Sequence, residues 1–259
     1  MTVTQDNAVA DGNASNHVQA IVTDANNNPL AGQAVTFTAD NGATVTTVIG
    51  TTSAEGIASA TLTNTRAGVS TVIARLANNA SKQASTSFIA DDSTAQISTT
   101  NLTVTQDNAV ADGEASNHVQ AIVTDANNNP LAGQTLTFMA DNNAMIATQT
   151  GTTGPDGVAS TTLTNTNAGQ TIVTATLDNN ASQSVKTTFV QNLSIQVETT
   201  ANSAIANEEY NTVTARVVNA LGNPVANVNV DFSSVESGIT LSPSSGKTNQ
   251  NGKISSSVA

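Results

Sequence analysis

Apolar and polar residues alternate in short stretches of this chain, and the alternation predicts β-strands. In the clearest stretch Val18, Ala20 and Val22 are separated by single residues, and after an interruption Val35 and Phe37 show the same spacing. A period of two gives each strand one apolar face. We therefore expect two strands here, joined by a tight connection.

The connection between these two strands contains residues that favour turns. Asn26–Asn28 tolerate the left-handed region, Pro29 restricts the residue before it, and Gly32 accepts a positive φ. On the first strand, Ile21 interrupts the polar side. We expect the outer face of that strand to be half covered for this reason.

This two-strand stretch occurs three times, and the repeat determines the predicted domain organisation. Residues 17–40 return almost unchanged at residues 118–141 and more loosely from Thr212 onward. A spacing of about 100 residues suits one β-sandwich per copy and is too long for a solenoid repeat. We predict three domains, at residues 1–91, 92–191 and 192–259.

The other strands of the first copy follow from the same alternation. We expect them at Thr2–Gln5, Ala43–Val48, Ile57–Thr63, Val69–Leu76 and Ser85–Ala90. Val72, Ala74 and Leu76 form the inward side of the fourth of these strands, because the period is two. The second copy repeats the whole plan with a fixed offset.

The third copy is shorter than the other two. Its last predicted strand is Lys253–Val258, and the two strands that close the first copy have no counterpart after it. We therefore expect the third domain to be incomplete, with an exposed sheet edge. At the other end, Met1 occupies the position that Leu102 has in the second copy, so we expect the chain to be a segment of a longer protein.

The residue types favour an all-β class with cores of small side chains. Thr and Val, which suit pleated surfaces, are abundant, and apolar residues show no helical periodicity. The chain has five Phe, one Tyr and no Trp. Each core must therefore consist mainly of Ala, Val, Ile and Leu, which bury modest area per residue.

The net charge and the lack of cysteine exclude several functions. The formal charge is −12, which disfavours nucleic acid and anionic lipid as partners, because both require a basic surface. Without cysteine the chain can form neither a disulfide nor a thiolate site. No apolar run is long enough to span a bilayer, so we expect no membrane insertion by this segment. We expect a soluble, monomeric rod.

Several spaced motifs occur together in both complete copies. They are DNAVADG at Asp6–Gly12 and Asp107–Gly113, then V-x-A-x-V-x-D, N-x-P-L-A-G-Q-x-x-T-F and TLTNT-x-AG. With these motifs the chain resembles the bacterial immunoglobulin-like domain, group 1, of the intimin and invasin family. The third copy resembles it more loosely, since Asn219 replaces the aspartate of Asp24 and Asp125.

The resemblance implies tandem immunoglobulin-like β-sandwiches arranged as an elongated rod. Adhesins of this family are anchored in the outer membrane of Gram-negative bacteria by a separate N-terminal domain and export such a rod. We therefore expect a stalk segment at the bacterial cell surface, anchored by a domain outside this segment, that projects a binding tip. Each sandwich would add about 35 to 40 Å, and three would add about 100 Å.

Two other functions stay open. The domains themselves could bind a host cell-surface or extracellular-matrix protein, or they could mediate contact between bacteria. A binding surface needs an apolar patch or aromatic anchors. Tyr210 occurs only in the third copy, so it is the candidate partner-binding residue. The alternative is an ordinary strand residue at a domain joint.

The histidines do not indicate an enzyme. His17 and His118 occupy equivalent positions, and the third copy has Thr212 there. A catalytic histidine needs a positioned nucleophile and an orienting acid, and no nucleophile-elbow motif occurs. We expect both to be half-exposed strand residues, and we predict a chain without catalytic activity and without a cofactor.

Asp91 and Asp92 are the candidate calcium ligands. They lie at the first predicted joint, and carboxylate oxygens suit this ion. At the second joint Gln191 and Asn192 stand in their place, and the spacing of an EF-hand is missing. We therefore favour solvated loop carboxylates over a calcium site and predict no bound metal.

Overall fold

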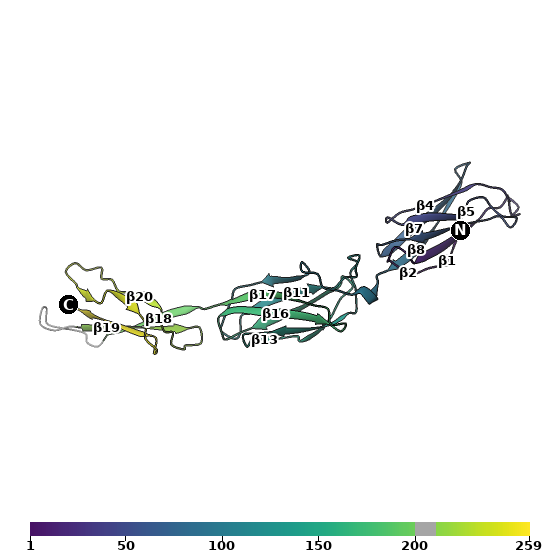
Figure 1. Cartoon of the computed structure of the whole chain (residues 1–259). Coiled ribbons are helices and arrows are strands. Elements are labelled where there is room, and N and C mark those ends of the chain that lie inside the picture. The colour runs from purple at the N-terminus through teal and green to yellow at the C-terminus, as the bar shows by residue number, and fades with distance from the viewer. Residues whose placement is uncertain (200–210) are drawn as a thin grey trace.

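The computed structural model describes residues 1–199 and 211–259 as three β-rich units that follow one another end to end (Figure 1). Within these ranges the one helix is the 3-10 helix η1, Asp92–Thr94, which lies between the first two units. The described part of the chain contains no helix long and apolar enough to cross a membrane. The predicted all-β class and the elongated tandem arrangement are confirmed.

The first unit is a sandwich of two four-stranded sheets. One sheet has the order β1-β3-β6-β5, from Thr2–Gln5, Ser15–Ile21, Ile57–Thr63 and Thr44–Ile49. The other has the order β2-β8-β7-β4, from Ala8–Val9, Ser81–Ile89, Gly68–Leu76 and Val35–Ala39. All pairs are antiparallel except β2 with β8, which is parallel.

The two strands expected in the repeated stretch are present, but they do not form a hairpin with each other, because β3 and β4 lie in opposite sheets. The connection closes on itself instead: the N–H of Leu30 donates to the carbonyl of Val22 and that of Asp24 to the carbonyl of Asn28, both at 2.9 Å. The chain then crosses to the other sheet. Both apolar faces therefore point into the same interior from opposite sides.

The outer face of β3 is half covered, as predicted, since Ser15, His17 and Gln19 are half-buried, and Ile21 is its most exposed residue. Its side chain is 57% exposed, because the outer face of β3 is not covered by a further layer of the sandwich. Between the sheets the inward residues are closely packed: Val18 and Leu62 from one sheet meet Val72 and Phe88 from the other, and all four are buried. The alternation therefore identified the inward side of the strand correctly.

The last strand of the first sandwich begins earlier than predicted. We expected Ser85–Ala90, whereas β8 pairs with β7 from Ser81 onward, opposite Arg75. The added residues are mostly polar and exposed. They lack the alternation that reveals a strand in sequence, because ladder hydrogen bonds come from the backbone and need no apolar side chain.

The second unit repeats the first with one local change. One sheet has the order β13-β15-β11-β9, from Met145–Ile146, Val158–Thr164, Ser116–Ile122 and Leu102–Gln106. The other has the order β10-β17-β16-β12-β14, from Ala109–Val110, Ser182–Val190, Gly169–Leu177, Thr135–Ala140 and Thr150–Thr152. The region equivalent to β5 is thus divided between the two sheets.

The third unit is smaller in the part of the chain that the structure describes. One sheet has the order β18-β19-β23-β21, from Leu193–Thr199, Asn211–Asn219, Lys253–Val258 and Leu241–Ser242. The other pairs β20, Asn229–Asp231, with β22, Ser245–Lys247. Its buried apolar cluster contains Ala215, Val217 and Val230. The strand predicted at Lys253–Val258 is confirmed.

Candidate functional site

The joint between the first two sandwiches is a polar site with many hydrogen bonds, and Asp125 lies at its centre. Asp125 follows β11 and is completely buried. Its Oδ1 accepts hydrogen bonds from the backbone N–H of Asn127 and of Asn129, both at 2.8 Å. Its Oδ2 accepts from Nδ2 of Asn129 at 2.8 Å and from the N–H of Asp91 at 3.1 Å. The carboxylate thus holds both its own loop and the linker.

Burial and hydrogen bonding act in opposite directions on the pKa of Asp125. Burial raises the pKa, because it removes the charged carboxylate from water. The hydrogen bonds from Asn129, Asp91 and Asn127 stabilise the charge and lower the pKa, and the net result is a pKa below the ordinary value of 3.8. Asp125 is therefore ionised at neutral pH and keeps its loop in one conformation.

Two asparagine side chains of this loop cross the joint. Asn129 donates from Nδ2 to the carbonyl of Thr65 and accepts at Oδ1 from the N–H of Ala67, both at 2.9 Å. Asn127 donates from Nδ2 to the carbonyl of Ala10 at 2.9 Å. All three bonds use backbone groups of the first sandwich. The contact therefore depends on the backbone conformation at that end of the sandwich and not on its side chains.

The linker itself is built into the second sandwich. Ala95 and Ile97 belong to the buried core of that unit. Gln96, which lies between these two residues, exchanges backbone hydrogen bonds of 2.9 and 3.0 Å with Thr124. Nδ2 of Asn179 donates to the carbonyl of Ala95 at 2.8 Å. The segment that connects the units is therefore an ordered part of the fold and not a free tether.

The two candidate calcium ligands have other partners at this joint. Oδ1 of Asp91 caps η1 by accepting from the N–H and the hydroxyl of Ser93, at 3.0 and 2.6 Å. Oδ1 of Asp92 accepts from Nε2 of Gln134 at 3.3 Å. No group of three or more His, Asp or Glu side chains suited to a metal ion occurs in residues 1–199 and 211–259. The prediction that these carboxylates are solvated loop residues without a bound metal stays untested.

The second joint has a different structure. β17 ends at Val190 and β18 begins at Leu193, and no hydrogen bond joins the second and third units among their described residues. The equivalent loop has Asn219 in place of Asp125 and Leu221 in place of Asn127. The side chain of Leu221 cannot donate a hydrogen bond across a joint. Tyr210, the candidate partner-binding residue, lies outside the described residues.

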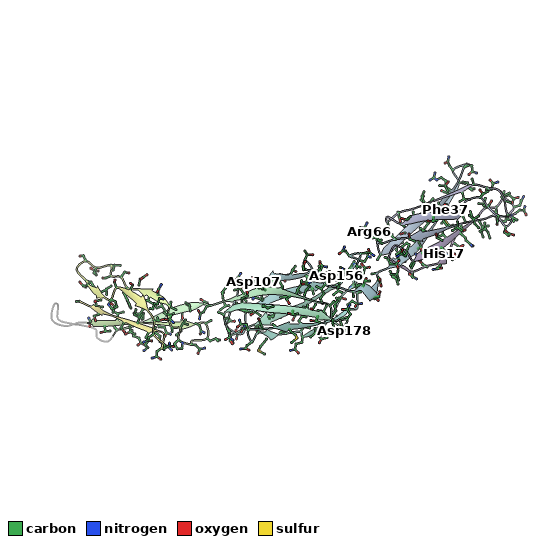
Figure 2. All side chains as sticks on the ribbon, viewed as in Figure 1. His17, Phe37, Arg66, Asp107, Asp156 and Asp178 are labelled. Carbon is green, nitrogen blue, oxygen red and sulfur yellow. The ribbon has the colours of Figure 1, made fainter. Side chains whose placement is uncertain are left out.

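The histidines occupy similar positions in the first two sandwiches. Nε2 of His17 lies 3.1 Å from the hydroxyl of Ser15, and Nε2 of His118 lies 3.3 Å from that of Ser116. Both side chains are half-buried on strands, as predicted, and Figure 2 shows His17 well away from the joint. No carboxylate is hydrogen-bonded to either imidazole in the part of the chain that the structure describes.

The sequence reasoning missed Asn127 and Asn129 as joint residues. The Asn-rich stretch predicts turn formation alone, and that role is confirmed, since Asn128 has a φ of 65°. The first copy contains the same letters at Asn26–Asn28. Nothing within the loop reveals which copy contacts a neighbouring domain, so the signal lies only in the order of the units.

The geometry of the three units agrees with the comparison with known proteins. The family model described as "Bacterial Ig-like domain (group 1)" matches residues 1–89, 99–190 and 194–259. The chain belongs to this family. Because the matched segments cover most of the chain, the resemblance seen in the motifs is confirmed for all three units, including the third, more divergent one.

Three known proteins show how far the likeness extends. The inverse autotransporter adhesin YeeJ of Escherichia coli strain K12 is 35% identical over 273 residues, which cover 97% of this chain and 11% of YeeJ. The chain thus spans 11% of the length of that curated relative. The E. coli adhesin FdeC is 21% identical with a TM-score of 0.63, covering 99% of this chain and 86% of the FdeC chain. InvD of Yersinia pseudotuberculosis is 19% identical with a TM-score of 0.54, covering 99% and 82%. The two structures support the fold alone.

Proposed function

We propose that this chain is a stalk segment of a bacterial outer-membrane adhesin that projects a binding tip from the cell surface. The observation that carries the proposal is the first joint, where a buried linker and three cross-joint hydrogen bonds hold two sandwiches end to end. A joint of this kind fixes the orientation of one unit relative to the next. Similarity to YeeJ, an adhesin by name, supports the same function.

The proposed function is mechanical. In this proposal the units are residues 1–91, 92–191 and 192–259, and they form a monomeric rod without catalytic activity, cofactor or bound metal. The chain would be anchored by a domain outside this segment. The charge of −12 supports the proposal, because like-charged neighbouring rods repel one another and do not stick.

Two measurements on the purified chain test this function. Small-angle X-ray scattering should show an extended monomer with a maximum dimension of about 100 Å or somewhat more. Binding to host cells and to a panel of matrix proteins should not saturate above background, with or without a calcium chelator. A compact particle would contradict the rod, and saturable binding would contradict a purely spacing role.

A second candidate function is protein binding by the third unit. Three apolar side chains follow one another on alternate positions of β18: Leu193, Ile195 and Val197 are 40, 56 and 62% exposed. Exposed apolar stripes of this kind are typical of contact surfaces. If the chain binds a host or bacterial protein, Ile195→Ser and Tyr210→Ala should each weaken that binding. The control Ser194→Ala, on the opposite face of the same strand, should not.

A further inference from the structure

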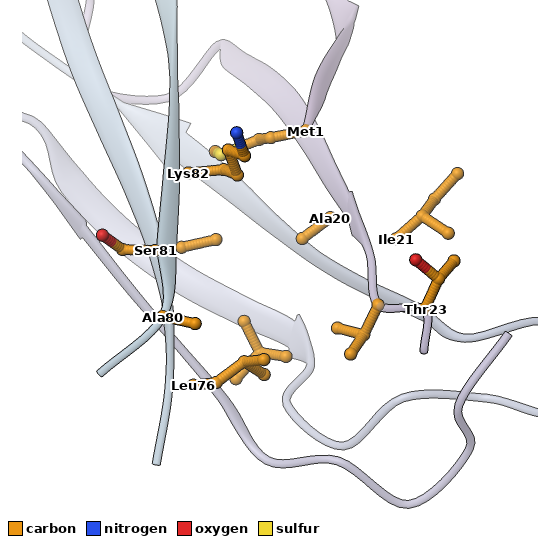
Figure 3. Close-up of a pocket in the computed structure, with 11 residues that line it drawn as sticks. Met1, Ala20, Ile21, Thr23, Leu76, Ala80, Ser81 and Lys82 are labelled. Atoms are coloured by element: carbon orange, nitrogen blue, oxygen red, sulfur yellow. The ribbon is translucent and has the colours of Figure 1, made fainter. Parts of the chain in front are cut away.

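The end of the first sandwich that faces away from the second contains an open groove. A cavity of about 220 Å³ lies between the two sheets there, and Figure 3 shows Met1, Ala20 and Leu76 around it. Val22 and Val35 complete its apolar floor. The groove lies where β3 and β7 end and where β4 and β8 begin, so backbone groups at the ends of the strands border it.

The equivalent place in the second sandwich is filled. Its apolar residues are nearly the same as those of the groove, with Leu136 in place of Val35 as the single difference among the five that correspond to Ala20, Val22, Val35, Ala74 and Leu76. There Ala95 and Ile97 of the linker pack into the core with Leu136 and Leu177. Two side chains two positions apart on an extended segment point the same way, and both enter the space between the sheets.

The polar groups beside the two grooves differ in the same manner. In the second sandwich the backbone of Thr124 pairs with Gln96, and Nδ2 of Asn179 donates to the carbonyl of Ala95. The corresponding groups of the first sandwich are the backbone of Thr23 and Nδ2 of Asn78, and neither makes a hydrogen bond with any described residue. The first sandwich thus presents both the apolar floor and the free backbone groups.

Burial of neighbouring residues shows what the filled groove changes. Leu30 is 36% exposed in the first sandwich, whereas Leu131 at the equivalent position is 2% exposed. Thr23 is exposed, whereas Thr124 is buried. Since the local sequence TDANNNPLAGQ is identical in the two copies, the difference comes from the linker and the domain that precede the second sandwich.

We propose that the groove of the first sandwich is a docking site for an extended peptide segment with the chemistry of Ala95-Gln96-Ile97. The small and the β-branched side chains enter the cavity, and the backbone of the middle residue pairs with Thr23, as a strand added to an edge. A second copy of this chain does not supply the segment, because its own Ala95 and Ile97 are buried in its own second sandwich. The proposal is independent of the stalk function.

The test extends the 259-residue chain by a copy of residues 91–101 placed directly before Met1. Met1 occupies the position of Leu102, so the extension reaches the groove with the register seen in the second sandwich. Hydrogen exchange of the Thr23 amide should slow by about tenfold or more, because this N–H gains a partner. Exchange in the second sandwich should not change.

The matched control is the same extension with aspartate in place of the isoleucine that copies Ile97. It has the same length and nearly the same composition, but its charge opposes entry into an apolar cavity. Equal exchange rates of Thr23 in the two extended chains would overturn the proposal. Dimerisation of the unextended chain that the extension abolishes would also overturn it, since a second copy would then occupy the groove.

Discussion

At the residue scale, one carboxylate performs the same task in two different environments. Asp24 and Asp125 each accept hydrogen bonds from the two backbone N–H groups and the side chain of their own Asn-rich loop. Asp125 is buried and accepts in addition from the linker at Asp91, whereas Asp24 is partly exposed. The same residue is therefore a loop organiser in the first sandwich and a joint residue in the second.

Substitution of Asp125 should have an effect that depends on pH. The pKa of Asp125 is lower in the folded state than its ordinary value of 3.8, so the ionised group stabilises the fold above that value, and this stabilisation disappears as the pH falls through the folded pKa. Asp125→Asn should reduce the unfolding free energy of the second sandwich by about 1 to 3 kcal/mol at pH 7 and by clearly less at pH 3. Urea unfolding monitored by NMR at both pH values measures this.

Asp24→Asn is the matched control for that substitution. Its loop has the same internal hydrogen bonds but no contact with another domain among the described residues. It should weaken the first sandwich and leave the second unchanged. A loss of stability for Asp125→Asn that is equal at pH 7 and pH 3 would show that the charge of the carboxylate does not contribute.

Gly157 should be far less tolerant of a side chain than Gly133, although both have φ near +74°. A Cβ at Gly157 would lie 2.5 Å from the carbonyl oxygen of Val123, whereas a Cβ at Gly133 would have no atom within 4 Å. Gly133→Ala should cost about 1 kcal/mol for the left-handed backbone alone. Gly157→Ala should cost about 1 to 3 kcal/mol more. Equal losses in chemical denaturation would contradict this steric explanation.

At the scale of elements, a buried asparagine links the two sheets of each complete sandwich. Asn117 on β11 accepts at Oδ1 from the N–H of Ala109 on β10 and donates from Nδ2 to the carbonyl of Thr188 on β17, both at 2.9 Å. Asn16 makes the equivalent bonds in the first sandwich. These bonds hold the short parallel strand β10 in place. They are needed because a strand of two residues makes few hydrogen bonds with its neighbour β17.

Asn117→Ala should therefore destabilise the second sandwich by about 1 to 3 kcal/mol, because two half-buried backbone groups lose their partner. The exchange of the Ala109 amide should accelerate beyond that of the other strands, since the parallel strand would detach first. Thr188→Ala is a useful control, because it keeps the backbone carbonyl that accepts from Asn117. A uniform increase in exchange across all strands would contradict the specific role.

At the scale of the whole molecule, the two joints should differ in stiffness. The first has a buried linker and hydrogen bonds from Asn127 and Asn129 to the preceding unit, and the second has neither among the described residues. A joint with fewer contacts allows a wider range of angles. The rod of Figure 1 is thus expected to bend mainly between the second and third units.

Removal of the cross-joint hydrogen bonds should loosen the first joint without unfolding either sandwich. The chain has no native cysteine, so spin labels at Thr47→Cys and Gln170→Cys, both exposed positions, report on the distance between the first two units alone. Asn127→Ala with Asn129→Ala should broaden that distance distribution. Asn26→Ala with Asn28→Ala changes the equivalent loop of the first sandwich and should leave it narrow. Equal distributions in both variants would contradict a role of the asparagines in stiffness.

The sequence alone determined the features that depend on local rules. The period of two identified β6 at Ile57–Thr63 and the inward residues Val72 and Ala74, because alternation follows from backbone geometry within one strand. The repeat identified three similar units, and the motifs identified their family. Turn positions such as Gly32, with φ of 73°, followed from the conformational freedom of one residue.

Only the tertiary structure decided which strands pair and which loops meet a neighbour. β3 and β4 follow one another in sequence but lie in opposite sheets. Strand pairing depends on contacts between residues that are far apart in the sequence. The clearest case is the stretch TDANNNPLAGQ, which is the same in both complete copies. Leu131 and Asn129 are buried in the second copy, whereas Leu30 and Asn28 are exposed in the first, because a linker and a whole sandwich pack against the second copy in the described residues.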